Sequence, residues 1–262
     1  MNTFIYSTWV NFVISKNRIM DLKNKIIIVV GASSGIGLST ARHLHKKGAC
    51  IIMVARNQAR LNDAAKKVNK DRTRLSLVSA DMTTQQGRTK ILNSAPTIDH
   101  LIITAADLAY MPFKNFTEEA AVKIINSKLL APFFLTQIVV GKLTSKSSIT
   151  FTSGIAAEKP MRGGALTGAV NAALNSLVKG LALELAPVRV NAVSPGWTET
   201  PVWENVIPNQ VKRREIIETM SKKIPLGRIG KAEDIAMAME AIITNDFINA
   251  SVLDINGGQL LV

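Results

Sequence analysis

The chain has 262 residues, 47% of them apolar and 19% charged, so it can bury a sizeable core and is not a disordered chain. Lys and Arg outnumber Asp and Glu by 32 to 19, a net charge of +13, but the basic residues are scattered and only 5% of the chain is aromatic, which disfavours a nucleic-acid partner. One cysteine and three histidines exclude an intramolecular disulfide and a cysteine-based zinc cluster, and they make a histidine metal site improbable.

The first 19 residues are set apart from the rest of the chain. Residues 4–14 are fairly apolar, but no basic segment precedes them and no small-residue cleavage site follows, so we expect no signal peptide. Met20 looks like a natural start just before a first strand, and residues 1–19 are expected to be an upstream start or a disordered arm. No run of 18 or more apolar residues occurs, so we expect no membrane partner and a cytoplasmic protein.

Short apolar runs rich in β-branched residues alternate with amphipathic helical stretches across residues 20–262. Continuous apolar strands separated by helices indicate a parallel sheet that is covered on both faces. Right-handed crossovers make it a single doubly wound α/β domain of the Rossmann type. The predicted strands are Ile26–Val30, Cys50–Val54, Leu75–Ser79, Ile98–Thr104, Ser148–Thr152, Val188–Val193 and Ser251–Ile255. The predicted helices are Ile36–Lys47, Gln58–Asn69, Gln85–Asn93, one from Thr117 to about Gly141, Gly163–Leu185 and one that begins near Ala232.

A glycine-rich turn follows the first strand and opens the first helix. Glycines let the backbone turn tightly and approach a pyrophosphate, to which the helix N-terminus presents free N–H groups and a partial positive charge. Because this turn stands at the start of a βαβ unit, we predict a dinucleotide site rather than a turn without a ligand. The turn reads Gly31-Ala32-Ser33-Ser34-Gly35-Ile36-Gly37.

The end of the second strand predicts which nucleotide is bound. An NAD site places Asp or Glu there, on the ribose 2′-hydroxyl, but here Arg56 follows the strand and the first acid after it is Asp63. The Arg56 guanidinium can pair with a 2′-phosphate through charge-assisted bonds, and Ser33 and Ser34 can add hydroxyl donors. These residues favour NADP(H) as the nucleotide. The alternative is that Arg56 is one of many surface arginines without a ligand.

With these residues in place, the chain resembles the short-chain dehydrogenase/reductase family over residues 20–262. The resemblance implies a Rossmann-type fold, a nicotinamide cofactor, a small carbonyl or alcohol substrate, and a homodimer or homotetramer. Besides the glycine turn and Arg56, it is carried by Asp81-Met82 at the adenine-contacting position, Asn126 at the active-site asparagine position, Ser153 at the catalytic serine position, Pro195-Gly196 and Thr198 in the turn that packs on nicotinamide, and C-terminal signatures at 227–236 and 256–258.

The chain departs from the family's pattern at its pair of catalytic residues. The family carries Tyr followed four residues later by Lys, on one face of a helix; the Tyr is the general acid/base, and the Lys lowers its pKa and binds the nicotinamide ribose. Here Thr167 stands at the Tyr position and Asn171 at the Lys position, and the two tyrosines, Tyr6 and Tyr110, lie elsewhere. The motif after the fourth strand has also changed to Thr-Ala-Ala.

An aliphatic hydroxyl such as that of Thr167 is a much weaker acid than a phenol, whose pKa is near 10. Loss of acid/base catalysis costs on the order of 10²–10⁴ in rate, whereas hydride transfer is still supported by proximity. Ser153 can still polarise a carbonyl, and Asn126 can still hold a water. By topology, the nearest substitute proton donors are Tyr110, Lys159 and Glu158.

Two functions stay open. The first is an NADP(H)-dependent oxidoreductase that moves a hydride to or from a small carbonyl or alcohol and uses a non-standard proton donor. The second is a catalytically weak NADPH-binding sensor or scaffold. Most of the active-site framework is retained, which favours the oxidoreductase. Its expected substrate lid, about Pro201 to Ile224, offers Trp203, Val206, Ile207 and Met220 for an apolar pocket, rimmed by Lys212, Arg213 and Arg214.

Overall fold

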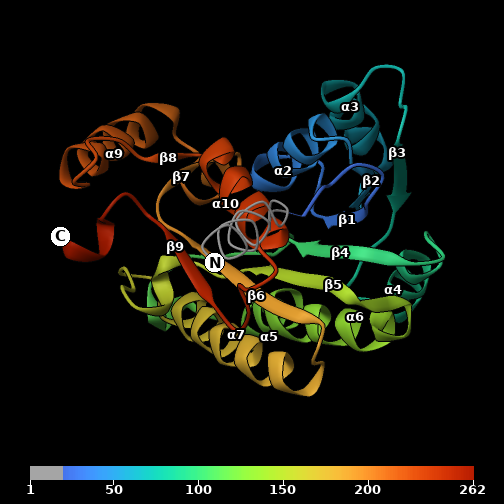
Figure 1. Cartoon of the computed structure of the whole chain (residues 1–262). Coiled ribbons are helices and arrows are strands. Elements are labelled where there is room, and N and C mark those ends of the chain that lie inside the picture. The colour runs from blue at the N-terminus through green and yellow to red at the C-terminus, as the bar shows by residue number, and fades with distance from the viewer. Residues whose placement is uncertain (1–19) are drawn as a thin grey trace, which may run out of the picture.

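A seven-stranded sheet forms the centre of the computed structural model, which describes residues 20–262. The expectation for residues 1–19 therefore lies outside the described residues. The strands are β1 (Ile26–Val30), β2 (Cys50–Ala55), β3 (Leu75–Ser79), β4 (Ile98–Ile103), β5 (Leu143–Thr152), β6 (Arg189–Pro195) and β9 (Val252–Ile255). Their order is β3-β2-β1-β4-β5-β6-β9, and every neighbouring pair is parallel (Figure 1).

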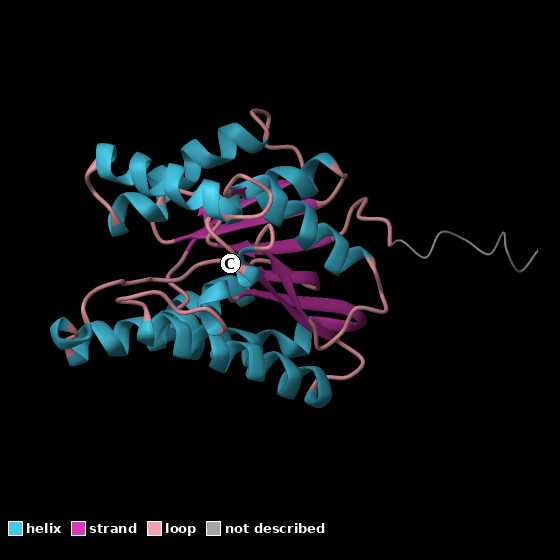
Figure 2. Ribbon diagram, turned by 90° about the vertical axis from the view of Figure 1, so that its left-hand side faces the viewer, coloured by secondary structure: helices cyan, strands magenta, loops and turns pink. Residues whose placement is uncertain are grey.

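Helices cover both faces of this sheet, as Figure 2 shows in a view that places the strands between two helical layers. One layer holds α2 (Gly35–Lys46), α3 (Gln58–Val68) and α10 (Ala232–Thr244), and the other holds α4 (Gln85–Leu92), α5 (Glu118–Ile125), α6 (Ala131–Val139) and α7 (Ala165–Glu184). The doubly wound α/β domain predicted from the sequence is thus confirmed. Because β1 pairs with β2 on one side and β4 on the other, the chain reverses its winding direction between β1 and β4.

Smaller elements stand at one end of the sheet. Here α8 (Val202–Val206) and α9 (Gln210–Lys223) lie in the chain between the two strands of a short parallel ribbon, β7 (Thr198–Glu199) and β8 (Gly230–Lys231). Short 3-10 turns lie at η1 (Phe113–Asn115), η3 (Val140–Lys142), η4 (Ile155–Ala157) and η5 (Gln259–Leu261).

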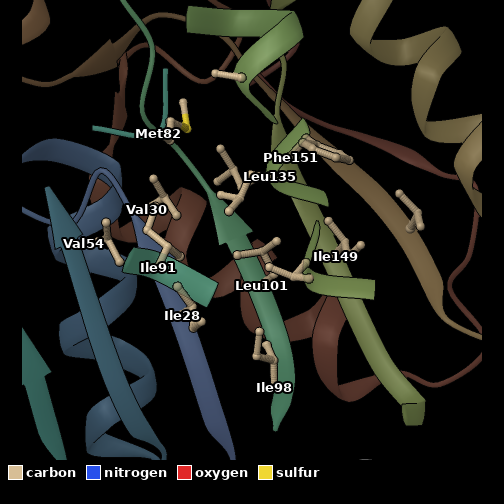
Figure 3. Packing of buried hydrophobic residues seen from close by; sticks show 14 of the residues in the cluster. Ile28, Val30, Val54, Met82, Ile91, Ile98, Leu101, Leu135, Ile149 and Phe151 are labelled. Atoms are coloured by element: carbon tan, nitrogen blue, oxygen red, sulfur yellow. The ribbon is translucent and has the colours of Figure 1, made fainter. Parts of the chain in front are cut away.

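The core lies in two apolar layers, one on each face of the sheet, because side chains alternate along each strand. Ile27 and Val29 of β1 point into the layer under α2 and α10, whereas Ile28 points into the layer under α6 and α7. Figure 3 shows part of this second layer, where Leu101 and Phe151 pack with Leu135 of α6. Burial on both faces explains why the strands read as continuous apolar runs rather than as alternating patterns.

The long helix predicted before the fifth strand is interrupted in the structure. A π-helical turn, η2 (Asn126–Leu130), separates α5 from α6, and the N–H of Ala131 donates to the carbonyl of Asn126, five residues back. Pro132 has no N–H, so the carbonyl of Lys128 lacks its ordinary α-helical partner. The run of helical hydrogen bonds is therefore weakened where the wider π-turn forms. Such turns are frequent at functional sites.

The segment Glu118–Lys142, which contains α5 and α6, is long and apolar enough to pass a test for a membrane span, although less than half of its most apolar window is buried. Its α6 part nevertheless packs Leu135 and Val139, both fully buried, against the sheet. A helix that covers a parallel sheet needs this apolar character, so we assign it as a core helix of the domain.

Candidate active site

A cavity of about 820 Å³ opens at the carboxyl ends of the strands. Parallel sheets bind ligands at this edge, beside the point where the winding direction reverses. Residues that follow β1, β2, β3, β4, β5 and β6 all line the cavity, together with residues of α8 and α9. Within residues 20–262, no group of three or more His, Cys, Asp or Glu side chains is placed to hold a metal ion.

The glycine turn forms the floor of one end of the cavity, and two of its glycines have no room for a side chain. Gly31 has a φ of +91°, and a Cβ there would lie 2.6 Å from the Thr104 hydroxyl oxygen. A Cβ on Gly37 would lie 2.3 Å from the carbonyl oxygen of Gly31. The backbone of β1, the turn and α2 is therefore packed as closely as the pyrophosphate-binding fingerprint requires.

The N-terminus of α2, like that of α7, lacks the side-chain cap that four other helices of this chain carry. Its N-cap residue, Ser34, makes no capping hydrogen bond. The residues at the same position of α3, α4, α5 and α9, in contrast, each accept one from a backbone N–H: Asn57, Thr84, Thr117 and Asn209. The first-turn N–H groups of α2 are thus left for a ligand, and such a terminus attracts anions. The turn fits a pyrophosphate, and Ser33, Gly35 and Ile36 line the cavity beside it.

Arg56 lies where the sequence predicts it, at the end of β2 on the cavity wall. Its guanidinium pairs with the carboxylate of Asp107, with nitrogen–oxygen distances of 3.1 and 3.3 Å. The Arg56 side chain is 59% exposed, so this ion pair is weak and the guanidinium can turn toward an incoming phosphate. The sequence analysis did not anticipate Asp107, whose carboxylate belongs to the loop after β4.

Asp81 and Met82 also line the cavity, after β3. A carboxylate oxygen of Asp81 accepts hydrogen bonds from the backbone N–H of Thr83 at 2.9 Å and from its hydroxyl at 2.7 Å. This arrangement fixes the local turn. Met82 is buried against the core and also lines the cavity. The pair thus forms a rigid apolar wall with one fixed carboxylate, on the same side of the cavity as Arg56.

Pro195, Gly196 and Thr198 close the opposite side of the cavity after β6. The hydroxyl of Thr198 donates to the carbonyl of Gly196 at 3.0 Å. A Cβ on Gly196 would lie 2.7 Å from the side-chain oxygen of Gln259, which accepts from the N–H of Trp197 at 2.9 Å. The turn is therefore held rigidly against the C-terminal segment.

Ser153, Thr167 and Asn171 are brought together in the middle of the cavity wall, and all three are at least 95% buried. The hydroxyl of Ser153 donates to the backbone carbonyl of Asn171 at 3.2 Å. The hydroxyl of Thr167 donates to the carbonyl of Ala109 at 3.1 Å. The Asn171 amide nitrogen reaches the carbonyl of Gly154 at 3.4 Å, and its side-chain oxygen is buried without a partner among residues 20–262.

Asn126, the fourth residue predicted for the catalytic centre, is not among the residues that line the cavity. The π-turn that begins at Asn126 presents Ser127 and Lys128 to the cavity instead. The sequence analysis missed Lys128, although a lysine inside an apolar helix face is a signal that it is held by something specific. Of the three substitute donors named from topology, Tyr110 and Lys159 line the cavity and Glu158 does not.

Aromatic side chains form the outer wall. The rings of Trp197 and Trp203 are stacked, with centroids 4.2 Å apart, and Tyr110 stands 6.3 Å from Trp203. Burial raises the pKa of the Tyr110 phenol above its usual value. From the predicted lid, Trp203 and Met220 line the cavity. The other residues named for the lid lie outside the cavity lining: Val206, Ile207, Lys212, Arg213 and Arg214.

Comparison with known proteins agrees with this geometry. A family model described as enoyl-(acyl carrier protein) reductase matches residues 31–259. The short-chain dehydrogenase/reductase ATR9 of Stachybotrys chlorohalonatus is 27% identical over 92% of this chain and 98% of its own length. The structure of the MalC reductase/Diels-Alderase of Malbranchea aurantiaca superposes with a TM-score of 0.84 at 28% identity, over 92% of this chain and 98% of that one.

A further solved structure, a small-chain dehydrogenase in complex with NADPH, has a TM-score of 0.78 and 26% identity, over 92% of this chain and all of that one. The protein therefore belongs to the short-chain dehydrogenase/reductase family. Its members are oxidoreductases that bind a nicotinamide cofactor, and the glycine turn with its close-packed backbone and uncapped helix N-terminus is the part of this chain that fits the cofactor's pyrophosphate.

Proposed function

We propose that the protein is an NADP(H)-dependent oxidoreductase that transfers a hydride to or from a small carbonyl or alcohol substrate. The observation that carries this proposal is a single cavity that joins the uncapped N-terminus of α2 and Arg56 at one end to Ser153 and an aromatic wall at the other. The relative solved with NADPH supports the choice of nucleotide.

The cofactor's parts match successive segments of the wall. The turn from Gly31 to Gly37 would hold the pyrophosphate, and Arg56 with Ser33 and Ser34 would hold a 2′-phosphate. Asp81 and Met82 would flank the adenine, while Pro195, Gly196 and Thr198 would pack against the nicotinamide. When bound, the reduced cofactor supplies the hydride; this chain's residues bind and orient the reactants and handle the proton.

The catalytic centre would work with Ser153, Thr167 and Asn171. The buried Ser153 hydroxyl lies where it can donate to a substrate oxygen if its hydrogen turns away from the Asn171 carbonyl. Thr167 would position the substrate rather than protonate it, because an aliphatic hydroxyl is too weak an acid. The proton donor would then be non-standard.

The aromatic wall indicates the kind of substrate. Trp197, Trp203 and Tyr110 offer flat apolar surfaces, and aromatic rings pack best against other flat rings. A planar carbonyl compound fits this aromatic end of the cavity, which the basic lid residues Lys212, Arg213 and Arg214 do not line.

The proposal includes a homodimer or homotetramer in the cytoplasm, without a nucleic-acid or membrane partner. Large apolar side chains are exposed on the outer face of the α5–α6 segment, among them Val122, Leu130 and Phe134. Such a patch is typical of a surface that a second copy covers. Light scattering of the purified protein would measure the mass of the assembly directly.

A paired titration with NADPH and NADH tests the proposal. We expect NADPH to bind at least about tenfold more tightly, since a charge-assisted hydrogen bond is worth roughly 1.5–3 kcal/mol. Arg56→Ala should abolish this preference, and Arg42→Ala, a change of an exposed arginine on α2 that does not line the cavity, should leave it intact. Equal binding of both nucleotides would exclude NADP(H) specificity, and binding without any turnover would favour a sensor or scaffold.

A further inference from the structure

Lys128 is a buried lysine whose charge has no carboxylate partner among the described residues. Its residue exposure is only 6%, and its ammonium donates to the backbone carbonyls of Thr152 at 2.8 Å and Ser153 at 3.1 Å. Burying a charge that carbonyl dipoles alone compensate is costly. A fold that retains such a group at a cavity wall uses it for something that an apolar side chain cannot do.

The ammonium of Lys128 also has a hydrogen to spare. A lysine carries three N–H donors, and the residues the structure describes supply two acceptors, both at the end of β5. Lys128 lines the cavity, so the third donor has an acceptor only if a water or a ligand provides one.

Asn171 offers the complementary group on the same stretch of wall. Its side-chain oxygen is buried and unpartnered in the described part of the chain, while its amide nitrogen reaches the carbonyl of Gly154. Lys128 on η2 and Asn171 on α7 therefore approach the segment 152–154 from two elements that pack together. A water or hydroxyl accepts and donates at once, so one such group between them would satisfy both.

Lys128 lies within the π-turn η2, beside Ser127, and both residues are buried. Pro132 weakens the ladder there, and the Ser127 hydroxyl accepts from the N–H of Asp107 at 3.1 Å, which anchors the turn to the loop after β4.

We propose that Lys128 is the proton source for carbonyl reduction in this chain, acting through a water held between its ammonium and the side-chain oxygen of Asn171. The inference rests on the proposed function and names the donor that function lacks. It also explains how a site with threonine at 167 can still complete a reduction.

The carbonyl carbon of the substrate takes up a hydride with both of its electrons, and the π pair of the C=O bond moves onto the oxygen. That oxygen takes a proton from the water, and the water takes one from Lys128, which is left as a neutral amine. The reduced nicotinamide is oxidised, the carbonyl becomes an alcohol, and the amine regains its proton from solvent.

The acidity of Lys128 suits this role. Burial lowers the pKa of its ammonium to about 8, so the group is mostly protonated at neutral pH and releases its proton readily. Tyr110, which also lines the cavity, is a poorer donor, because burial raises the pKa of its phenol above the usual value.

Calorimetry gives a test that needs no substrate. NADP⁺ places a positive nicotinamide near Lys128 and lowers the pKa of the ammonium, whereas NADPH does not. At about pH 8 the 2′-phosphate is already fully ionised, so extra proton release with NADP⁺ reports on Lys128. A pKa decrease of one unit would release about 0.4 proton, measured as the dependence of binding heat on the ionisation enthalpy of the buffer.

Lys128→Met should abolish this extra release, and Lys128→Gln, which keeps donors for the two carbonyls, should abolish it as well. Lys142→Met is the matched control, because Lys142 also donates to two backbone carbonyls, those of Leu92 and Ala95, but lies outside the cavity lining. This control should release protons like the wild type. The same release from both Lys128 variants as from the wild type would overturn the proposal and leave the proposed function standing.

The pH profile of turnover is the second readout, with 9,10-phenanthrenequinone as a flat carbonyl probe. The rate of NADPH oxidation should fall above about pH 8 in the wild type and in Lys142→Met. Both Lys128 variants should be at least about 10²-fold slower and lack this fall. Wild-type rates in both Lys128 variants would refute the proton role, whereas failure of the wild type to bind either nucleotide would refute the proposed function itself.

Discussion

At the scale of single residues, the ion pair between Arg56 and Asp107 stands out, because it occupies the guanidinium that the proposed 2′-phosphate needs. The Asp107 carboxylate also repels that phosphate through its own charge. The pair is largely exposed on the Arg56 side, so it opposes binding weakly rather than blocking it.

Asp107→Asn should therefore tighten NADPH binding by up to about fivefold, which corresponds to roughly 1 kcal/mol, and leave NADH nearly unchanged. A fluorescence titration of both nucleotides measures this directly. An equal loss of affinity for both nucleotides would show instead that the carboxylate holds a group that they share.

His100 lies fully buried in β4, and one of its ring nitrogens pairs with the hydroxyl of Ser148 at 2.8 Å. Burial lowers its pKa from 6.5 to about 4. The unfolded chain thus takes up a proton at this histidine before the folded chain does. Its contribution to stability is fully present above about pH 6.5 and is lost as the pH falls toward 4.

The free energy of unfolding should fall by about 3 kcal/mol between these pH values on account of His100. Urea titrations at several pH values would measure the slope. His100→Asn, which can still pair with Ser148 but does not titrate, should flatten it. An unchanged slope in this variant would assign the acid sensitivity to other groups.

At the scale of elements, the sequence predicted the strands and most helices closely, because the apolar runs are bounded by glycine, polar or charged residues. It did not predict the break at η2. Residues 117–141 read as one amphipathic helix, and the π-turn depends on how Pro132 and Ser127 meet the rest of the fold. The strand β5 also begins five residues earlier than expected, at Leu143, because Leu143 pairs with Ile98 ahead of a polar stretch.

The junction between β6 and α10 depends on one buried cation. Arg189 donates to the carbonyls of Ile242 and Ile243 at 2.9 Å each and to that of Ile248 at 2.7 Å. The first two belong to the last turn of α10, where the carbonyls have no helical partners and a positive charge is favourable.

Arg189→Leu should lower the free energy of unfolding by at least about 2 kcal/mol, because it leaves buried carbonyls without donors. Arg42→Leu, which removes an exposed ion pair with Glu233, should cost less than about 1 kcal/mol. Denaturant unfolding of both variants makes the comparison, and similar losses would contradict the capping role of Arg189.

At the scale of the whole molecule, the sequence predicted the fold and a set of candidate cofactor-binding residues that the structure gathers along one cavity. Each of these residues follows a strand, and parallel strands bring their carboxyl ends to one edge of a sheet. Every residue predicted to hold the cofactor lines the cavity. The residues on the catalytic side of the cavity were harder to predict. Lys128 and not Asn126 faces the cavity, and this exchange accompanies a π-turn in the helix that no sequence motif indicates.

In the proposed function, one cavity both binds the nucleotide and reduces a carbonyl. The most direct test loads the wild-type protein with NADPH, adds 9,10-phenanthrenequinone and follows the absorbance of the reduced nicotinamide in a single turnover. We predict a saturable loss of this absorbance that Ser153→Ala slows by at least about tenfold. A bound cofactor whose absorbance stays constant with this quinone and with a wider panel of carbonyl compounds would contradict the account and point to a nucleotide-binding sensor or scaffold.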